Sequence, residues 1–271
     1  MAVDHYENFP VASILLPKSI RRAVKIIYYF ARQADDIADE GDLSNSERLA
    51  KLDALRAELN RIDTAQGPQT ELFIALASTV NKYKLPLALL HDLLDAFTQD
   101  VVKKRYANFD ELLDYCRRSA DPIGRLLLHL YDAATPQNLI YSDQICTSLQ
   151  LINFWQDVQK DYAISRIYLP QDEMFRFKVD ETQIAAAKSD DAWRALMKFQ
   201  VERARELLRQ GTPLGSILSG RIGLEMRLII AGGNRILSKL EKVDYDMFRH
   251  RPVLRPYDWL IMLANSAAFK F

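Results

Sequence analysis

The sequence predicts an all-α protein. Only nine glycines occur among 271 residues, and apolar residues recur mostly at spacings of three and four, the periodicity of helices with one buried face. Alternating runs of β-branched residues, which are typical of strands, are few. Hydrophobic residues make up 49% of the chain, enough to build a sizeable core. We expect one domain over residues 1–271, because no linker rich in Pro, Gly or Ser divides the chain.

The helix boundaries follow from periodicity and from the residues that begin or end a helix. Ser46 and Asn108 can cap free N–H groups, and Pro86 and Pro122 suit the first turn of a helix. The segment Ile164–Glu173 is expected to be an ordered loop. In chain order, the predicted helices are Lys18–Asp39, Ser46–Ile62, Thr70–Lys82, Pro86–Val102, Asn108–Arg118, Pro122–Leu130, Tyr141–Asp161, Asp180–Lys188, Asp191–Gln210, Gly220–Lys242 and Tyr257–Phe269.

Charge and composition exclude several classes of protein. The chain has 36 Lys and Arg against 36 Asp and Glu, so it has no excess positive charge for nucleic acid. The uncharged stretches Gln144–Gln156 and Trp259–Phe269 are shorter than the ~18 apolar residues that a transmembrane helix needs. The N-terminus lacks a signal-peptide pattern, and Cys116 and Cys146 cannot form a disulfide framework. We expect a cytoplasmic protein with reduced thiols.

A first acidic cluster lies at the C-terminal end of the predicted helix Lys18–Asp39. At about 100° per residue, Asp35 and Asp39 continue the apolar face of this helix, and Asp36 lies further round. A solvated helix end is the alternative interpretation, but the position on the apolar face favours carboxylates that point inward or into a cavity. Carboxylates at a helix C-terminus are also unfavourable unless cations lie nearby.

A second polar cluster lies in SLQLINFWQDVQKDY. Asn153, Asp157 and Asp161 are each four residues apart, and Gln150 lies seven residues before Asp157, so their oxygens form one stripe on a helix. Apolar neighbours predict that this helix is buried, and buried carboxylates need compensation. Two or three magnesium ions with a diphosphate would provide it, because magnesium prefers oxygen ligands. A di-iron site is disfavoured, since no histidine follows a glutamate by three residues.

At this point the sequence resembles the squalene/phytoene synthase family over nearly its whole length. The resemblance implies an isoprenoid synthase fold, a helical bundle around a central cavity. Within the family, HYENFPVAS and LINFWQD indicate the bacterial branch that makes hydroxysqualene. Members of this branch release diphosphate from presqualene diphosphate and let water capture the rearranged carbocation, without a nicotinamide. The matching segments are HYENFPVAS, ARQADDIADE, YCRRSADPIGRL, NFWQDVQKDYAISRIYLP and YDMFRHRPVL.

The resemblance also assigns roles to individual residues. The two acidic motifs are expected to bind magnesium, three aromatic positions to line the reaction cavity, and polar residues beside the motifs to contact diphosphate. Further aromatic rings could stabilise a carbocation, and the N-terminal segment could position water. The metal ligands are Asp35, Asp39, Asn153, Asp157 and Asp161, with Asp36 in the first motif; the cavity residues are Tyr28, Tyr115 and Tyr168; the substrate-binding residues are Arg32, Gln150, Arg166, His5, Asn8, Phe9 and Phe154.

Two positions depart from the commoner family pattern. Glu7 stands where a small hydroxyl residue usually helps to hold a diphosphate, and Gln156 stands where a basic residue is usual. Both changes reduce positive charge, as expected if the cavity accommodates one diphosphate instead of two. The alternatives are a transferase that condenses two farnesyl diphosphates to presqualene diphosphate, squalene or dehydrosqualene, and a non-catalytic helical scaffold.

The expected substrate also suggests partners. A thirty-carbon chain is insoluble in water, so Trp259–Phe271 could form an amphipathic contact with the inner membrane surface. The resemblance further implies handover of substrate and product with a presqualene diphosphate synthase and a hydroxysqualene dehydroxylase.

Overall fold

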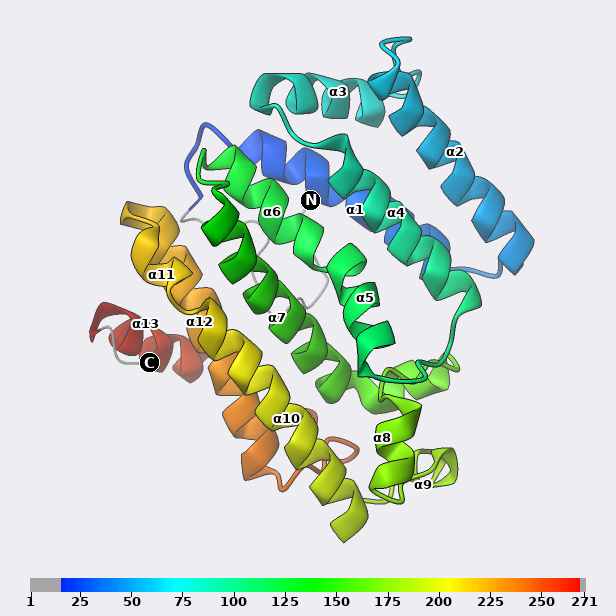
Figure 1. Cartoon of the computed structure of the whole chain (residues 1–271), viewed down its shortest axis with the longest axis vertical. Helices are drawn as coiled ribbons and strands as arrows, with labels where there is room; N and C mark the ends of the chain where they lie inside the picture. Colours follow the sequence, from blue (N-terminus) through cyan, green and yellow to red (C-terminus); the bar gives the residue numbers. More distant parts are fainter. Residues whose placement is uncertain (1–15, 269–271) are drawn as a thin grey trace.

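The structure is a computed structural model that describes residues 16–268, with the side chains of residues 16–264. Within that range every regular element is a helix, which confirms the all-α prediction (Figure 1). The helices are α1 (Arg21–Asp39), α2 (Asn45–Asp63), α3 (Glu71–Tyr83), α4 (Leu87–Val102), α5 (Phe109–Ser119), α6 (Asp121–Leu130), α7 (Pro136–Ala163), α8 (Gln171–Arg176), α9 (Glu181–Ala185), α10 (Asp191–Gly211), α11 (Leu214–Ile217), α12 (Gly220–Lys242) and α13 (Pro256–Ala268).

Helix α7 runs through the middle of the molecule (Figure 1) and contributes to one of two apolar cores. One core lies among α1 to α4 and α6, where Phe30 meets the edge of Phe73. The other core joins α7 to α5, α10 and α12 and encloses Trp155 and Trp193, both fully buried. The prediction that the helix of the second polar cluster is buried is therefore confirmed.

Several helix starts have the predicted cause. Asn108 accepts a hydrogen bond from the N–H of Glu111 at 3.0 Å, and Pro122 lies in the first turn of α6. At α2 the capping residue is Ser44 instead of Ser46, because Ser44 and Glu47 form a reciprocal capping box. Pro86 is the residue before α4 and not part of its first turn.

Other boundaries differ from the predictions. Helix α7 begins at Pro136, five residues before the predicted Tyr141, because Thr135 caps the helix through the N–H of Asn138. The segment predicted as the helix Asp180–Lys188 contains only the short α9. The expected loop Ile164–Glu173 is ordered by backbone hydrogen bonds to the segment after α4, but α8 already begins within it, at Gln171. Helix α11 was not predicted.

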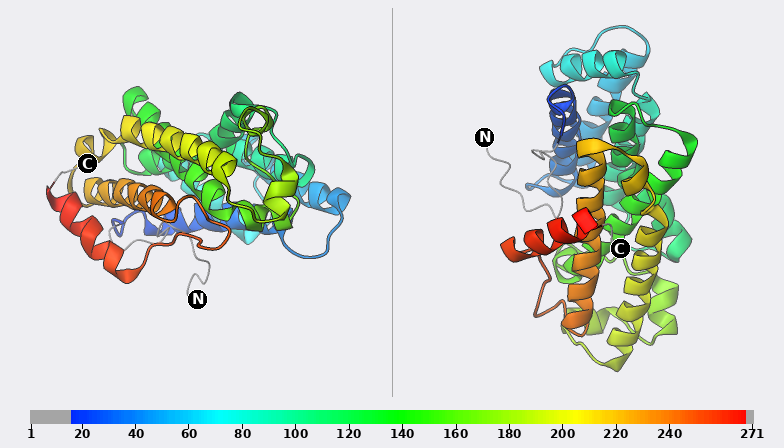
Figure 2. Two further views of the ribbon diagram at one scale, coloured as in Figure 1. Left: turned by 90° about the horizontal axis from the view of Figure 1, so that it is seen from below. Right: turned by 90° about the vertical axis from the view of Figure 1, so that its left-hand side faces the viewer.

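Helix α13 crosses the outside of α12 at the edge of the molecule (Figure 2). It begins one residue before the predicted Tyr257, and Phe269–Phe271 lie outside the described residues. Within residues 16–268, no helix has both the length and the apolar composition that crossing a bilayer requires.

Candidate active site

The first acidic cluster lies at the C-terminal end of α1, where Arg32 joins its carboxylates. Arg32 lies 3.2 Å from Asp35 and 2.6 Å from both Asp36 and Glu40. The side chains of Asp35 and Asp36 are 40% and 43% exposed, so both are partly open to solvent. Burial, followed by repulsion from Asp39, raises the pKa of Asp35 to about 7.

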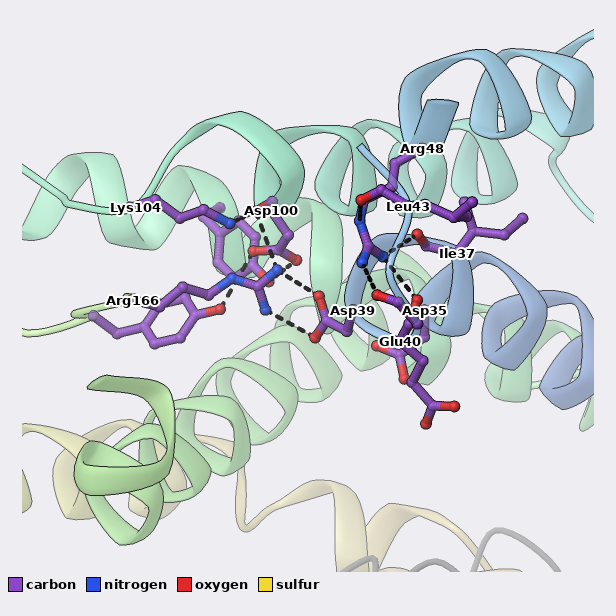
Figure 3. Close-up of polar contacts among 12 residues, drawn as sticks. Asp35, Ile37, Asp39, Glu40, Leu43, Arg48, Asp100, Lys104 and Arg166 are labelled. Atoms are coloured by element: carbon purple, nitrogen blue, oxygen red, sulfur yellow. Dashed lines mark hydrogen bonds and ion pairs between the residues drawn. The ribbon is translucent and has the colours of Figure 1, made fainter. Parts of the chain in front are cut away.

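The end of α1 is positioned by Arg48 of α2 (Figure 3). The Arg48 guanidinium donates hydrogen bonds to the carbonyl oxygens of Ile37 at 2.7 Å and Gly41 at 2.7 Å, and to two further carbonyls. These are carbonyls that a helix end and its following turn leave without partners. The cation also offsets the unfavourable dipole at this acidic helix end.

Arg166 connects the two halves of the site (Figure 3). It lies in the RIYLP segment after α7 and forms a bidentate ion pair with Asp39 of α1, one bond of which is 2.8 Å long. Its guanidinium also donates to the backbone carbonyl of Asp100 at 3.1 Å. The neighbouring backbone holds Arg166 in place. The N–H of Ile167 donates to the Lys104 carbonyl at 3.0 Å, and this bond holds the RIYLP segment against the residues after α4.

The second cluster lies along the last turns of α7. Asp157 accepts two hydrogen bonds from Arg251, at 2.6 and 2.8 Å. Burial alone would raise the pKa of Asp157, but these bonds and the charge of Arg251 lower it below its ordinary value. The opposite holds for Asp161, because burial and repulsion from Asp157 raise its pKa to about 8. Within residues 16–268, no side chain forms an ion pair with Asp161.

A buried carboxylate, Asp100 of α4, was not among the predicted site residues. It is 5% exposed and accepts hydrogen bonds from the hydroxyls of Tyr115 at 2.7 Å and Tyr168 at 3.3 Å. Burial raises the pKa of Asp100 to about 6, although Arg166 and Tyr115 oppose the shift. Asp100 therefore fixes the orientation of two tyrosines that the sequence placed in the cavity.

Aromatic rings gather beside the acidic end of α7. Phe154 and Tyr168 stack with ring centroids 3.7 Å apart and planes 9° apart. Tyr115 lies 5.8 Å from Tyr168 and 6.1 Å from Phe154, and Tyr106 stacks on Tyr168 at 5.6 Å. A small pocket adjoins this aromatic cluster and is lined by Phe154, Trp155, Val158, Asp161, Arg166, Ile167, Tyr168 and Leu169.

The other predicted site residues are placed as follows. Tyr28 lies one turn before Arg32, partly buried, with its ring 6.0 Å from that of Tyr29 and outside the aromatic cluster around Tyr168. Gln150 and Asn153 are partly buried on α7, in the stripe with Asp157. His5, Asn8 and Phe9 lie outside the described residues.

Arg48, Asp100 and Arg251 are the polar residues of this site that sequence reasoning missed. Arg251 lies inside the matched segment YDMFRHRPVL, so a basic residue opposite the second acidic motif could have been suspected. Asp100 and Arg48 gave no such signal, because neither lies in a segment that the resemblance matched and each shares its helix with other residues of the same charge.

The donor set suits hard divalent cations that bring further oxygen ligands with them. Within the described part of the chain, no three acidic, histidine or cysteine side chains gather as a ready-made metal site. Yet Asp35, Asp100 and Asp161 all have raised pKa values, and repulsion from Asp39 contributes to each. Carboxylates from α1 and α7 therefore act on one another electrostatically. An added cation would relieve this repulsion, and Mg²⁺ commonly combines one or two carboxylates with phosphate oxygens.

Comparisons with known proteins give a consistent assignment. The sequence profile described as squalene/phytoene synthase matches residues 2–258. A hydroxysqualene synthase from Sinorhizobium fredii is 34% identical over 98% of this chain and 91% of the relative. Another from Rhodopseudomonas palustris is 36% identical over 94% of this chain and 86% of the relative. The crystal structure of squalene synthase HpnC from Alicyclobacillus acidocaldarius superposes with a TM-score of 0.82 at 34% identity, covering 89% of this chain and 90% of the other.

Proposed function

The chain belongs to the squalene/phytoene synthase family, and from that membership we propose that it converts presqualene diphosphate into hydroxysqualene. In this reaction the bond between a substrate carbon and the diphosphate oxygen breaks, and the electron pair leaves with the diphosphate. The carbocation rearranges, water adds to it through a new carbon–oxygen bond, and the added water loses a proton. The enzyme would therefore act as a carbon–oxygen lyase and needs no nicotinamide.

The acidic end of the site would bind the leaving group. Asp35, Asp39, Asn153, Asp157 and Asp161 would hold magnesium, which supplies positive charge that stabilises a departing diphosphate. The carboxylates of the two helices already repel one another, so they favour a cationic ligand. Arg32, Arg166 and Arg251 keep positive charge beside these carboxylates. Asp36, which pairs with Arg32, would orient that guanidinium.

The aromatic cluster would stabilise the carbocation. The rings of Tyr115, Phe154 and Tyr168 lie within 6.1 Å of one another beside Asp161. An aromatic face can contribute ~0.5 to 2 kcal/mol to a nearby cation in a desolvated site. The hydrogen bonds to Asp100 engage the hydroxyls of Tyr115 and Tyr168. These hydrogen bonds hold the two rings in a fixed orientation.

One observation supports this proposal above the others: Asp161 of α7 lines a pocket beside the aromatic rings, and Arg166, which lines the same pocket, pairs with Asp39 of α1. Magnesium diphosphate chemistry needs such carboxylates, and a carbocation needs the aromatic rings. The identity of 34% and 36% to hydroxysqualene synthases over nearly the whole chain favours this substrate.

Product analysis tests the proposal. We expect the chain, given presqualene diphosphate and magnesium alone, to release hydroxysqualene and diphosphate. The second candidate is head-to-head condensation of two farnesyl diphosphates, which is favoured by the equal 34% identity to a protein described as a squalene synthase. Consumption of farnesyl diphosphate with no turnover of presqualene diphosphate would establish that candidate instead.

A thermal-shift measurement distinguishes an enzyme from a helical scaffold of the same fold. We expect magnesium plus a non-hydrolysable diphosphate analogue to raise the melting temperature, and Asp157→Ala to abolish the rise. The matched control is Asp95→Ala, which removes an ion-paired carboxylate of α4 whose partner is Arg56. Equal shifts in both variants would favour the scaffold.

The proposed reaction also defines its neighbours in a pathway. A presqualene diphosphate synthase must supply the substrate, and a hydroxysqualene dehydroxylase would consume the alcohol. To test direct handover, the enzymes are mixed, labelled intermediate is formed and an unlabelled pool of the same intermediate is added. Direct handover would leave the label less diluted than release of the intermediate into solution would.

A further inference from the structure

Two buried N–H groups beside the aromatic cluster have no hydrogen-bond partner among the described residues. One is the indole Nε1–H of Trp155, which is fully buried on α7, and the other is the Nε–H of Arg166, which is 6% exposed. The terminal nitrogens of Arg166 are already engaged, because they donate to Asp39 and to the Asp100 carbonyl (Figure 3). A buried donor without a partner is costly, so such a pair of donors indicates a bound ligand.

Both donors belong to residues that line one pocket, the small pocket beside the aromatic cluster, which we call the Trp155–Arg166 pocket. A buried water typically makes about three hydrogen bonds to polar groups that otherwise lack partners. The two N–H groups supply two of these bonds, and Asp161, which also lines the pocket, can accept the third from the water. The remaining walls include the apolar side chains of Val158, Ile167 and Leu169. The pocket therefore suits a single ordered water better than bulk solvent.

The Trp155–Arg166 pocket lies where the two parts of the proposed site meet. Asp161, a proposed magnesium ligand, lines it, and so do Phe154 and Tyr168, the stacked rings proposed to stabilise the carbocation. A water bound here is near both the leaving group and the cation. The proposed reaction consumes one water, and a small pocket with apolar walls limits how many can reach the cation.

We propose that the Trp155–Arg166 pocket binds an ordered water through these two N–H groups, and that this water captures the carbocation. The inference rests on the proposed function and adds to it the residues that position the nucleophile. Trp155 and Arg166 act through the water and are positioning residues.

The two donors also set the order of events. Both lone pairs of the water oxygen accept hydrogen bonds, so the water attacks only after one bond opens. The bond to the neutral indole of Trp155 is the weaker, because the guanidinium of Arg166 is a charged donor. Its opening frees the lone pair that forms the new carbon–oxygen bond, and the oxygen then loses a proton to the released diphosphate. This delay lets the carbocation rearrange before capture.

A high-resolution crystal structure of the full chain tests the binding step without substrate. We expect a water oxygen within about 3.2 Å of both the Trp155 Nε1 and the Arg166 Nε. A dry pocket, or a protein atom bonded to the Trp155 Nε1, would overturn the proposal. This measurement does not depend on whether any variant folds.

Products formed from presqualene diphosphate and magnesium test the capture step. Trp155→Phe keeps an aromatic ring and removes the N–H, which leaves one lone pair of the water free. The share of alcohols with an unrearranged carbon skeleton should rise roughly five-fold, the factor expected from one lost hydrogen bond. Val158→Ile adds a methyl group to the wall of the pocket and displaces the water. Its products should shift from alcohol to hydrocarbons, because the cation then loses a proton instead of gaining water.

Trp193→Phe is the matched control. Trp193 is also fully buried, but its indole N–H donates to the Tyr245 carbonyl at 2.9 Å, and Trp193 does not line the pocket. We expect this variant to lose stability and keep the product ratio. Unchanged products in both pocket variants, or the same change in Trp193→Phe, would overturn the proposal. An unaltered chain that makes no hydroxysqualene would refute the proposed function, whereas the crystal structure would still test the water site, so the two failures are distinguishable.

Discussion

Neighbouring carboxylates on α7 have opposite electrostatic environments although they lie one turn apart. Arg251 lowers the pKa of Asp157, whereas burial and Asp157 itself raise the pKa of Asp161 to about 8. Near neutral pH, Asp157 is therefore ionised, and Asp161 holds a proton for much of the time. A cation that binds both would displace that proton, as is general for carboxylate ligands.

A buried carboxylate outside the site, Asp121, also has a raised pKa, and this gives a prediction about stability. Asp121, at the start of α6, is 5% exposed and accepts a hydrogen bond from Thr147 at 2.9 Å. Burial, followed by repulsion from Asp143, raises its pKa to about 7. Because the folded-state pKa exceeds the unfolded value of about 3.9, the folded chain binds the extra proton. Its free energy of unfolding falls as pH rises from about 4 to about 7.

We expect Asp121→Asn to remove this fall in the free energy of unfolding. The variant should match the unaltered chain near pH 4.5 and exceed it at pH 8, with an upper bound of about 4 kcal/mol in the free energy of unfolding. Urea denaturation at both pH values measures the difference between the two proteins. A difference that does not change with pH would contradict the assignment.

The hydroxyl of Tyr115 gives a second prediction at the residue scale. Tyr115→Phe removes the 2.7 Å hydrogen bond to Asp100 and leaves that buried carboxylate oxygen without its donor. We expect a loss of about 1 to 3 kcal/mol in the free energy of unfolding. Tyr83→Phe is the matched control, because it removes an exposed 2.8 Å hydrogen bond to the Ser19 carbonyl and should cost about 0.5 kcal/mol or less. Equal losses in both variants would refute the role given to Asp100.

At the scale of elements, sequence patterns predicted most helices but not how the site is joined together. Apolar periodicity located α1, which has one buried face, and the many apolar residues of α7 located that helix. Periodicity cannot reveal pairs such as Arg166 with Asp39, which are 127 residues apart in sequence. Nor could it show that Asp100 points inward, since α4 has other acidic residues on exposed faces. Caps were predicted where the capping residue directly precedes the apolar pattern, as at Asn108, and missed at Thr135.

The packing of α6 on α7 gives a prediction at this scale. A Cβ atom on Gly124 would lie 2.3 Å from the Ser142 Oγ and 2.5 Å from the Cys146 Sγ, both on α7. Gly124→Ala should therefore separate the two helices and lower the free energy of unfolding by about 1 to 3 kcal/mol.

A double-mutant cycle provides the control for Gly124. In the background Ser142→Ala/Cys146→Ala the two clashing atoms are absent, so adding Gly124→Ala should cost much less than it does in the unaltered chain. Denaturation curves of the four proteins measure both costs. Equal costs in the two backgrounds would show that close approach of α6 and α7 is not the reason for this glycine.

At the scale of the whole molecule, α1 and α7 belong to two different apolar cores, and Arg166, just after α7, pairs with Asp39 at the acidic end of α1. Arg166 and Arg251 join these ends to segments that follow α7 and α12. A ligand that binds both acidic clusters would therefore stabilise the two cores together. Because several segments come together here, the site contains residues that are far apart in the sequence, from Arg32 to Arg251.

In the proposed reaction a carbon–oxygen bond breaks and water captures the carbocation. Turnover of presqualene diphosphate in ¹⁸O-labelled water, followed by mass spectrometry, tests it most directly. We predict one ¹⁸O atom in the hydroxyl of hydroxysqualene and none in the released diphosphate. An unlabelled alcohol together with ¹⁸O in the released phosphate product would show cleavage of a phosphorus–oxygen bond and would contradict the account.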